Sequence, residues 1–415
     1  MLPEVKIDKL IHGGQGLGVL PDGRKVLAWN VLPGEVVQIR STKSKKHYVE
    51  GVAENIIQAS PERIDPIDDA YLSTSPWQIM SFEAENKYKQ EILSEVFERE
   101  KIDYKAPIEF IAIKDSLHYR NKMEYSFWAD DTGLHLALFN RGTHGKRVVE
   151  GSSIAHPAVD ETASKIVEVL KAAGIRGSQL KTVIVRCNQA GEAVAALFVK
   201  DEDFPVLNGL AEVCKGIGVY YSTPKSPASV ITSKLYIAGD LTLTDKIIDA
   251  KLIYDVHSFF QVNLPVFELV AERIKGLCDK SDTIVDFYSG VGAIGVSVGA
   301  SILVDSDKHN VAMAKRNVGN TKIEVVRATA ETALDCIPSE GTLIVDPPRA
   351  GLHSKVIDQI CESSPDQVIY LSCNPSTQAR DLDLLKDCYD VVLLEGYNFF
   401  PRTPHIECLA VLKRK

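Results

Sequence analysis

The chain has 415 residues, which is too long for one compact domain, so we expect two or three domains. Apolar residues make up 45% and charged residues 25%, as is typical of a soluble globular protein. The net charge of −9 does not by itself favour a nucleic-acid partner. No stretch approaches the roughly 18 uninterrupted apolar residues of a membrane helix, and the start MLPEVKIDKL does not resemble a signal peptide. We therefore expect a cytoplasmic protein with no membrane partner. Its eight cysteines include no CxxC pair and predict free thiols.

The chain opens with short apolar segments separated by turns. Residues 4–58 alternate apolar and polar residues between PDG and PGE turns, which predicts a small antiparallel barrel. Residues 1–58 hold eight Lys and Arg against six Asp and Glu, whereas the rest of the chain is acidic. The basic residues of this module are either a solvated face or a patch for phosphates, notably Arg40, Lys43, Lys45 and Lys46.

The remaining chain shows two patterns of predicted secondary structure, which change at about residue 250. A boundary at SPERIDP (60–66) and a helix over 83–101 are followed by mixed strands and a second helix over 159–174. From residue 251 onward, buried-strand segments alternate with helical stretches, which predicts a Rossmann-like parallel α/β sheet. We therefore predict three domains: an OB-like barrel over 1–58, a central α+β domain over 59–250 and the α/β domain over 251–415.

Residues 284–295 (IVDFYSGVGAIG) have the order strand, glycine-rich turn, helix. Gly290 and Gly292 begin a GxGxxG pattern, which alone is a weak signal shared with nucleotide-dependent oxidoreductases. Asp286 at the end of the strand would repel a pyrophosphate but attract a sulfonium-bearing amino acid. Asp305 ends the next strand, where a carboxylate can accept both ribose hydroxyls. The pattern favours S-adenosylmethionine, while a purely structural glycine turn is the alternative.

A second polar loop follows the strand TLIVD. Asp346 precedes two prolines and Arg349, and the prolines predict a stiff loop at the mouth of the site. Methyltransferases that act on exocyclic amino groups carry an aromatic residue after the prolines, which stacks on the flipped base. Arg349 in that place favours a different chemistry, in which the guanidinium stabilises negative charge on the substrate.

Cys373 ends the next strand, in Ser-Cys-Asn-Pro. A lone cysteine is usually core filler, but one at a strand end beside the expected ligand favours catalysis. Carbon 5 of uracil attacks a methyl donor only after a thiolate has added at carbon 6, and this thiolate needs a low pKa from nearby cations. A base must then remove the carbon 5 proton. Glu407 in PRTPHIE is the candidate base, with His405 as its competitor and a surface acid as the structural alternative.

With these residues assembled, essentially the whole chain resembles the RNA uracil-C5 methyltransferase family. The matching motifs are YRNKMEYSF (119–127), LFNRGTH (138–144), FFQVN (259–263), DFYSGVGAIG (286–295), DPPRAGL (346–352), SCNPSTQARDL (372–382) and FPRTPHIE (400–407). The resemblance implies that Cys373 is the nucleophile and Glu407 the base. It also implies four contacts with S-adenosylmethionine, from Gln261, Tyr288, Asp305 and Asp346. The N-terminal barrel resembles the TRAM domain with which such enzymes hold RNA.

Two features depart from the family pattern. Many members bind a 4Fe–4S cluster through four cysteines, whose places fall here on Asp68, Thr74, Trp77 and Ser153. None of these is a thiolate, so we expect no iron–sulfur cluster and no other metal. The second departure is at residues 328–331, where the family often has Asp or Asn and this chain reads Ala-Thr-Ala-Glu. The contacts of the adenine ring therefore stay open.

The sequence thus predicts a monomeric enzyme that transfers a methyl group from S-adenosylmethionine to carbon 5 of a uridine in RNA. We expect ribosomal RNA rather than transfer RNA. Candidate RNA contacts are Arg120, Asn121 and Arg141, which have ordinary surface roles as the alternative, together with Arg349 at the site. Two other functions are conceivable, an RNA-binding protein with a decayed site and a nucleotide-dependent oxidoreductase. The intact nucleophile and base argue against both.

Overall fold

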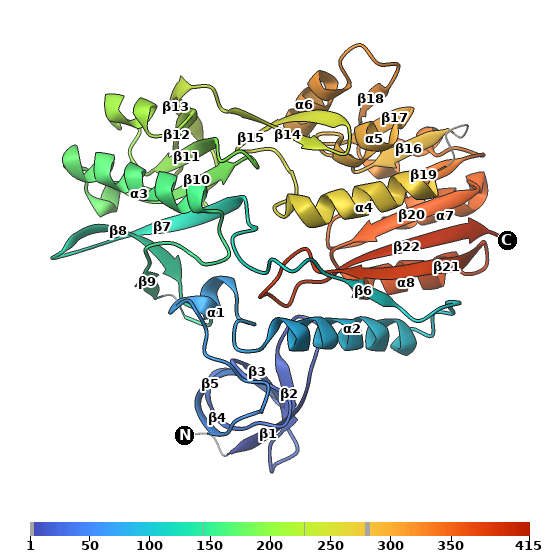
Figure 1. Cartoon of the computed structure of the whole chain (residues 1–415), viewed down its shortest axis with the longest axis horizontal. Helices are drawn as coiled ribbons and strands as arrows, with labels where there is room; N and C mark the ends of the chain where they lie inside the picture. Colours follow the sequence, from blue (N-terminus) through green and yellow to red (C-terminus); the bar gives the residue numbers. More distant parts are fainter. Residues whose placement is uncertain (1–3, 144, 228, 279–282) are drawn as a thin grey trace. The chain divides into compact units, whose positions relative to one another are not determined.

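The computed structural model describes residues 4–143, 145–227, 229–278 and 283–415 (Figure 1). The chain forms two compact units, and each combines segments that are distant in the sequence. Unit 1 comprises Met1–Glu85, Asp115–Leu243 and Pro401–Pro404, and unit 2 comprises Asn86–Lys114, Thr244–Phe400 and His405–Lys415. Unit 1 contains both the barrel and the central sheet, which are separate sheets. The predicted domain boundary at residue 58 therefore stays a prediction. Within the described residues, no helix is long and apolar enough to cross a bilayer.

The N-terminal part of unit 1 is a closed five-stranded barrel (Figure 1). Its strands follow the order β1-β2-β3-β5-β4, with bounds β1 (Val5–Leu10), β2 (Gly16–Val19), β3 (Lys25–Trp29), β4 (Val36–Ser44) and β5 (Tyr48–Gln58). Alternate side chains point inward and form a buried aliphatic core. The barrel was predicted to be antiparallel, but β3 and β5 pair in parallel. A closed barrel with an odd number of strands cannot alternate direction throughout, so at least one pair must be parallel.

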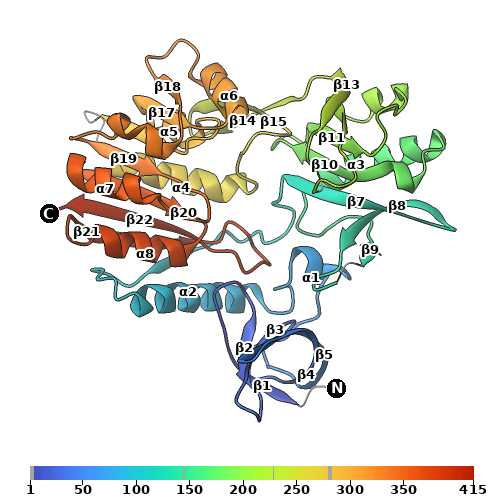
Figure 2. The ribbon, with the colours of Figure 1, turned by 180° about the vertical axis from the view of Figure 1, so that it is seen from behind.

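The rest of unit 1 is a seven-stranded sheet with one helix packed on it (Figure 2). The order is β13-β12-β11-β10-β7-β8-β9, with β7 (Lys122–Asp130), β8 (Gly133–Phe139), β9 (Lys146–Val148), β10 (Leu180–Cys187), β11 (Ala193–Val199), β12 (Gly216–Tyr221) and β13 (Ser233–Gly239). The predicted helix over 159–174 is α3 (Pro157–Ala172), and its apolar face completes the core of this sheet. Shorter elements are α1 (Tyr71–Thr74) and the 3₁₀ turns at Gly177–Gln179 and Asn208–Glu212.

Unit 2 contains an eight-stranded sheet of order β18-β17-β16-β19-β20-β22-β21-β6. The strands are β6 (Glu109–Ile111), β16 (Ile284–Phe287), β17 (Ile302–Asp305), β18 (Glu324–Arg327), β19 (Thr342–Val345), β20 (Gln367–Ser372), β21 (Tyr389–Tyr397) and β22 (Glu407–Arg414). Strands β16 to β20 pair in parallel, and β22 runs antiparallel to both of its neighbours. The predicted Rossmann-like α/β architecture is therefore confirmed, with one antiparallel strand inserted.

Helices cover both faces of this sheet. Figure 1 shows α4 in front of the strands, and Figure 2, from behind, brings α7 and α8 forward. The bounds are α2 (Phe82–Arg99), α4 (Leu264–Leu277), α5 (Ala293–Val298), α6 (Lys308–Val318), α7 (Ser354–Ser363) and α8 (Pro375–Leu385), with 3₁₀ turns at Ala330–Thr332 and Leu334–Cys336. The predicted helix over 83–101 is α2. A hairpin of β14 (Thr242–Ile247) and β15 (Ala250–Asp255) precedes α4.

One expectation about the cysteines is wrong. Cys361 at the end of α7 and Cys388 before β21 form a disulfide, with their Cα atoms 5.8 Å apart. The two residues are 27 positions apart in the sequence, and only the packing of α7 beside α8 brings them together. Within the described residues the other six cysteines form no disulfide, in agreement with the predicted thiols.

Candidate active site

The predicted polar residues gather at the carboxyl ends of neighbouring parallel strands. Asp286 lies on β16, Asp305 ends β17, Asp346 follows β19 and Cys373 follows β20. These four strands lie side by side in the order β17-β16-β19-β20. Because parallel strands end at the same edge of a sheet, the four side chains lie along one rim, where open α/β sheets bind their ligands.

The loop after β16 depends on left-handed backbone. Tyr288, Gly290 and Gly292 have φ angles of 63°, 57° and 85°. A Cβ atom on Gly292 would lie 2.9 Å from Cδ1 of Leu303, so a side chain there would be strained and crowded. The turn aims the amide of Gly290 at Oδ2 of Asp305, 2.9 Å away. The glycine pattern therefore shapes the loop and holds the carboxylate of β17.

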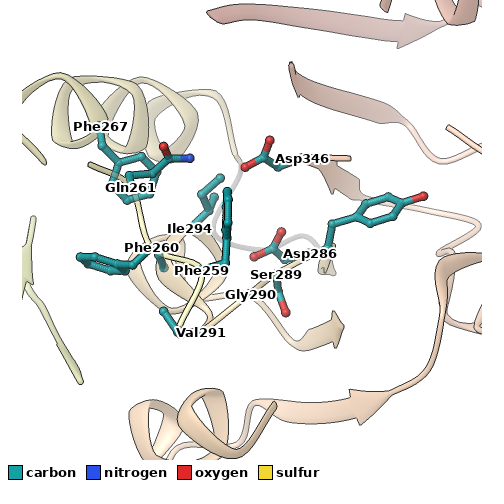
Figure 3. A pocket seen from close by; sticks show the side chains of 12 residues that line it. Phe259, Phe260, Gln261, Phe267, Asp286, Ser289, Gly290, Val291, Ile294 and Asp346 are labelled. Carbon is teal, nitrogen blue, oxygen red and sulfur yellow. The ribbon is translucent and has the colours of Figure 1, made fainter. Parts of the chain in front are cut away.

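A pocket lies between this loop and the segment that follows β15 (Figure 3). Figure 3 shows the amide of Gln261 and the carboxylates of Asp286 and Asp346 directed toward the same space. The remaining lining residues are Phe259, Phe260, Phe267, Tyr288, Ser289, Gly290, Val291, Ala293 and Ile294. The predicted cofactor residues Gln261, Asp286, Tyr288, Gly290 and Asp346 thus meet at one pocket. Gly292 belongs to the turn beside the pocket, and Asp305, at the end of β17, accepts a hydrogen bond from that turn.

The pocket is rich in carboxyl groups whose pKa values burial raises. Oδ2 of Asp286 accepts a hydrogen bond from the amide of Gly295 (2.9 Å), and its Oδ1 has no partner among the described residues. Burial raises the pKa of Asp286 to about 8, with the nearby carboxylates of Asp346 and Asp305 adding to the effect. Burial likewise raises the pKa of Asp346 to about 7. A buried acceptor without a partner in an acidic pocket suits a positively charged ligand.

Residues of α6 contact β15 and the segment after it, which lines the pocket, and the sequence did not reveal these contacts. His309 pairs with the carboxylate of Asp255 at 2.8 Å. Although burial opposes it, this hydrogen bond helps to lower the pKa of Asp255 to about 2. Oδ1 of Asn310 accepts from the amide of Phe259 (3.2 Å), and Asn317 bridges β15 to the glycine loop. No local pattern marks these residues, because each contact joins segments far apart in the sequence.

Cys373 and Glu407 lie beside each other across two antiparallel strands. Ser372 of β20 pairs with Cys408 of β22, so the next residue, Cys373, lies beside Glu407. Glu407 is only 4% exposed. Burial, together with the carboxylates of Glu407 and Asp346, raises the pKa of Cys373 to about 11, while Arg349 opposes this rise. Burial, with the charge of Asp346, also raises the pKa of Glu407. A lowered thiol pKa was expected, but in the protein alone burial and the two acids outweigh Arg349.

The loop with the two prolines is tied to α8. The backbone carbonyl of Arg349 accepts hydrogen bonds from Nδ2 of Asn374 (2.8 Å) and Oγ1 of Thr377 (3.2 Å). Arg380 donates to the carbonyl of Ala350 at 2.9 Å. These contacts fix the backbone of the loop while the Arg349 side chain stays exposed, close enough to lower the pKa of both Cys373 and Glu407.

The candidate RNA residues of unit 1 have local structural partners. Arg120 is half-buried and donates to the carbonyl of Lys122, and Asn121 is buried. The guanidinium of Arg141 lies 4.0 Å from the ring centre of Trp29 and donates to the carbonyl of Leu72. Arg141 therefore packs the barrel against its linker, and RNA contact by these residues stays a prediction. His144, the last residue of LFNRGTH, lies outside the described residues.

The positions that matched the cluster cysteines take part in hydrogen bonds. Asp68 accepts from the amide (3.0 Å) and Oγ (2.9 Å) of Ser153, and Gln78 donates to both residues. Oγ1 of Thr74 lies 3.5 Å from Oγ of Ser152. Trp77 is buried and donates to the carbonyl of Gly14. Hydrogen bonds here join the loop before α2 to residues 152–153.

Comparison with known proteins agrees with this geometry. Residues 82–415 match the family model described as tRNA (uracil-5-)-methyltransferase. An uncharacterized RNA methyltransferase of Fusobacterium nucleatum is 28% identical, with 99% of this chain and 96% of the relative covered. One of Halalkalibacterium halodurans is 29% identical, with 99% and 97% covered.

A solved structure shares the fold. The tRNA (uracil-54, C5)-methyltransferase of Pyrococcus abyssi, in complex with S-adenosyl-L-homocysteine, matches with a TM-score of 0.78 and 22% identity. The match covers 98% of this chain and 100% of that one. The resemblance drawn from the motifs is therefore confirmed: the chain belongs to the tRNA (uracil-5-)-methyltransferase family and is an S-adenosylmethionine-dependent RNA methyltransferase.

Proposed function

We propose that this enzyme methylates carbon 5 of a uridine in RNA, with Cys373 as nucleophile and Glu407 as base. The observation that carries the proposal is the placement of both residues side by side on the strand-end rim that also holds the acidic pocket. A decayed methyltransferase or an oxidoreductase gives no reason for a thiol and a buried carboxyl to meet there.

The residues of the pocket fit S-adenosylmethionine, which supplies the methyl group as an electrophile when bound. The ligand carries an ammonium and a sulfonium group, and Asp286 offers a buried oxygen without a partner among the described residues. The two positive groups of the ligand favour the ionised forms of Asp286 and Asp346. Gln261 and Tyr288 line the same pocket, and Asp305, held by the glycine loop, is the proposed ribose ligand. Gly290 and Gly292 shape that loop.

The first step assigned to the chain is attack on the uracil ring. Sγ of Cys373 forms a bond to carbon 6, and the electron pair of the 5,6 double bond moves toward carbon 5 and the carbonyl at carbon 4. The thiol must first give its proton to solvent, and a pKa of about 11 makes this costly in the protein alone. Arg349 is the cation that lowers the pKa of Cys373, and its exposed side chain is the candidate partner for negative charge on the base.

The last step releases the product. After carbon 5 has gained its methyl group, the carboxylate of Glu407 takes the remaining carbon 5 proton. The electron pair of that bond restores the 5,6 double bond, the bond between carbon 6 and Sγ breaks, and the sulfur leaves as thiolate. Burial raises the pKa of Glu407, which makes its carboxylate a stronger base than an exposed one.

The experiment separates these two roles. A denaturing gel of protein, substrate RNA and methyl-labelled cofactor should show a slow labelled band with Glu407→Gln, because methyl transfer is complete and elimination stalls. Cys373→Ala should give no band and no product. Cys336→Ala and Glu362→Gln, on other parts of unit 2, are controls and should behave as the wild type. Normal turnover by Glu407→Gln would move the base to His405, whose exposed ring lies 5.5 Å from that of Phe400.

The RNA class and its holding surface are also proposals. The target uridine must leave its stack to reach Cys373, at a cost of roughly a few kcal/mol, so loops and single strands are favoured. We expect ribosomal RNA, with transfer RNA, which the family's description names, as the second candidate. The barrel over 1–58 is proposed to act as a TRAM domain in a monomeric, cytoplasmic enzyme. Mapping 5-methyluridine by mass spectrometry in cells lacking the protein separates the two RNA classes.

A further inference from the structure

The segment that carries Glu407 into the site has an unusual path. Residues 398–406, here called the strap, join β21 to β22 and end directly before Glu407. Pro401–Pro404 belong to unit 1, whereas the residues before and after them belong to unit 2. The position of the proposed base therefore depends on what holds the strap.

A buried lysine of α2 holds the start of the strap. Lys89 is 0% exposed, and its Nζ donates to Oδ1 of Asn398 (2.7 Å) and to the carbonyl of Phe400 (3.1 Å). Nδ2 of Asn398 in turn donates to Oδ1 of Asn86, one turn earlier on the helix. Burying an ammonium group is costly unless hydrogen bonds compensate the lost hydration. The contacts of Lys89 with the strap are therefore costly to break.

The middle of the strap is held by a carboxylate on the preceding turn of α2. Both oxygens of Glu85 accept from the amide of Arg402, at 3.0 and 2.9 Å. Arg402 has a φ of 63°, a left-handed conformation that is uncommon for a residue with a side chain. Its carbonyl accepts from the amide of Trp77, and the hydroxyl of Tyr119 donates to the carbonyl of Pro401. The strap therefore has a fixed backbone.

The strap also contacts the segment that carries a proposed cofactor ligand. Nδ2 of Asn263 donates to the carbonyl of Phe399 at 3.0 Å, and its Oδ1 caps α4. Asn263 is two residues after Gln261 in FFQVN. The cofactor side and the base side of the site thus share one set of buried polar contacts.

We propose that Lys89 is a positioning residue that sets the reach of Glu407 to the carbon 5 proton. It acts at the elimination step, in which Glu407 gains the proton and the sulfur of Cys373 leaves as thiolate. The reason is geometric: proton transfer requires the carboxylate within hydrogen-bond distance of the carbon, and Lys89 donates to Asn398 and Phe400 in the strap before Glu407, whereas Cys373 follows a different strand, β20. This inference rests on the proposed role of Glu407.

The test compares Lys89→Met, which keeps an unbranched side chain one atom shorter and without the charge, with Lys87→Met on the exposed face of the same helix. In single turnover with methyl-labelled cofactor, Lys89→Met should transfer the methyl group within about threefold of the wild-type rate. Release of methylated RNA should fall about 10- to 100-fold, at or below the lower end of the roughly 10²–10⁴-fold that general-base assistance provides, because Lys89→Met displaces the base without removing it. The labelled covalent adduct should accumulate, and Lys87→Met should show none.

Two further variants keep the result decisive. In the Glu407→Gln background, Lys89→Met should cause no further loss, because both changes remove the same step. If Lys89→Met does not fold, as judged by circular dichroism, the half-buried Asn86→Ala decides and should give a smaller accumulation of adduct. Absence of adduct in the folded variant, or additive losses with Glu407→Gln, would overturn the inference. Normal turnover by Glu407→Gln alone would instead overturn the proposed base.

Discussion

Asp286→Asn tests whether the carboxylate of Asp286 favours binding of a cationic ligand and lowers the stability of the protein without ligand. The amide keeps an oxygen for the hydrogen bond from Gly295 and nearly the same shape. It removes the carboxylate whose pKa burial raises from 3.8 to about 8. An acid with a higher pKa in the folded than in the unfolded state stabilises the fold fully at low pH. Its contribution is lost as pH rises through the window between these two values.

The size of the effect follows from that window. Each unit of pKa difference corresponds to about 1.4 kcal/mol, so ionising Asp286 costs the wild-type fold about 5 kcal/mol by pH 8. About 2 kcal/mol of this loss falls between pH 6 and pH 8. For a folded body of the size of unit 2, a loss of about 2 kcal/mol corresponds to a decrease in melting temperature of roughly 4–8 °C. Asp286→Asn should not show this decrease.

The assay is thermal unfolding at pH 6 and pH 8, with and without S-adenosylmethionine. Asp358→Asn, an exposed acid on α7, is the matched control and should retain the wild-type pH dependence. Cofactor at 100 times its dissociation constant should stabilise the wild type by about 3 kcal/mol and Asp286→Asn much less. Identical pH dependence in wild type and Asp286→Asn would contradict the raised pKa of Asp286, and equal stabilisation by the cofactor would show that this carboxylate does not hold the ligand.

Two further predictions concern the barrel. Arg63→Met leaves the buried Glu35 without its ion pair (2.5 Å) and should destabilise unit 1 by roughly 3 kcal/mol. The exposed pair broken by Arg24→Met should cost about 1 kcal/mol or less in the same urea titration, and equal effects of the two variants would contradict the argument. Replacing both Lys45 and Lys46 with glutamine should weaken RNA binding and lower its salt slope by about 0.7–0.9 for each phosphate that the protein no longer neutralises. An unchanged slope would remove this surface from the RNA interface.

Sequence patterns determined the parts of this protein that depend on neighbouring residues. The glycine turn after Asp286 was predictable because left-handed backbone needs glycine, and the parallel sheet because buried strands are uniformly apolar. The placement of Asp305 and Cys373 at strand ends followed from the same patterns. The proposed nucleophile and base also rest on the resemblance of whole motifs, because local physics alone would have left several alternatives.

Tertiary structure decided what depends on residues distant in the chain. The elevated pKa of Cys373 sums the burial and charges that several elements contribute, so no local pattern contains it. Three contacts join segments that no sequence pattern relates to each other. They are the disulfide of Cys361, the stacking of Arg141 on Trp29 and the hydrogen bond from Lys89 to the strap. The parallel strand pair of the barrel follows from closure of the whole sheet. Periodicity indicates which face of an element is buried, whereas only the folded chain determines which partner that face meets.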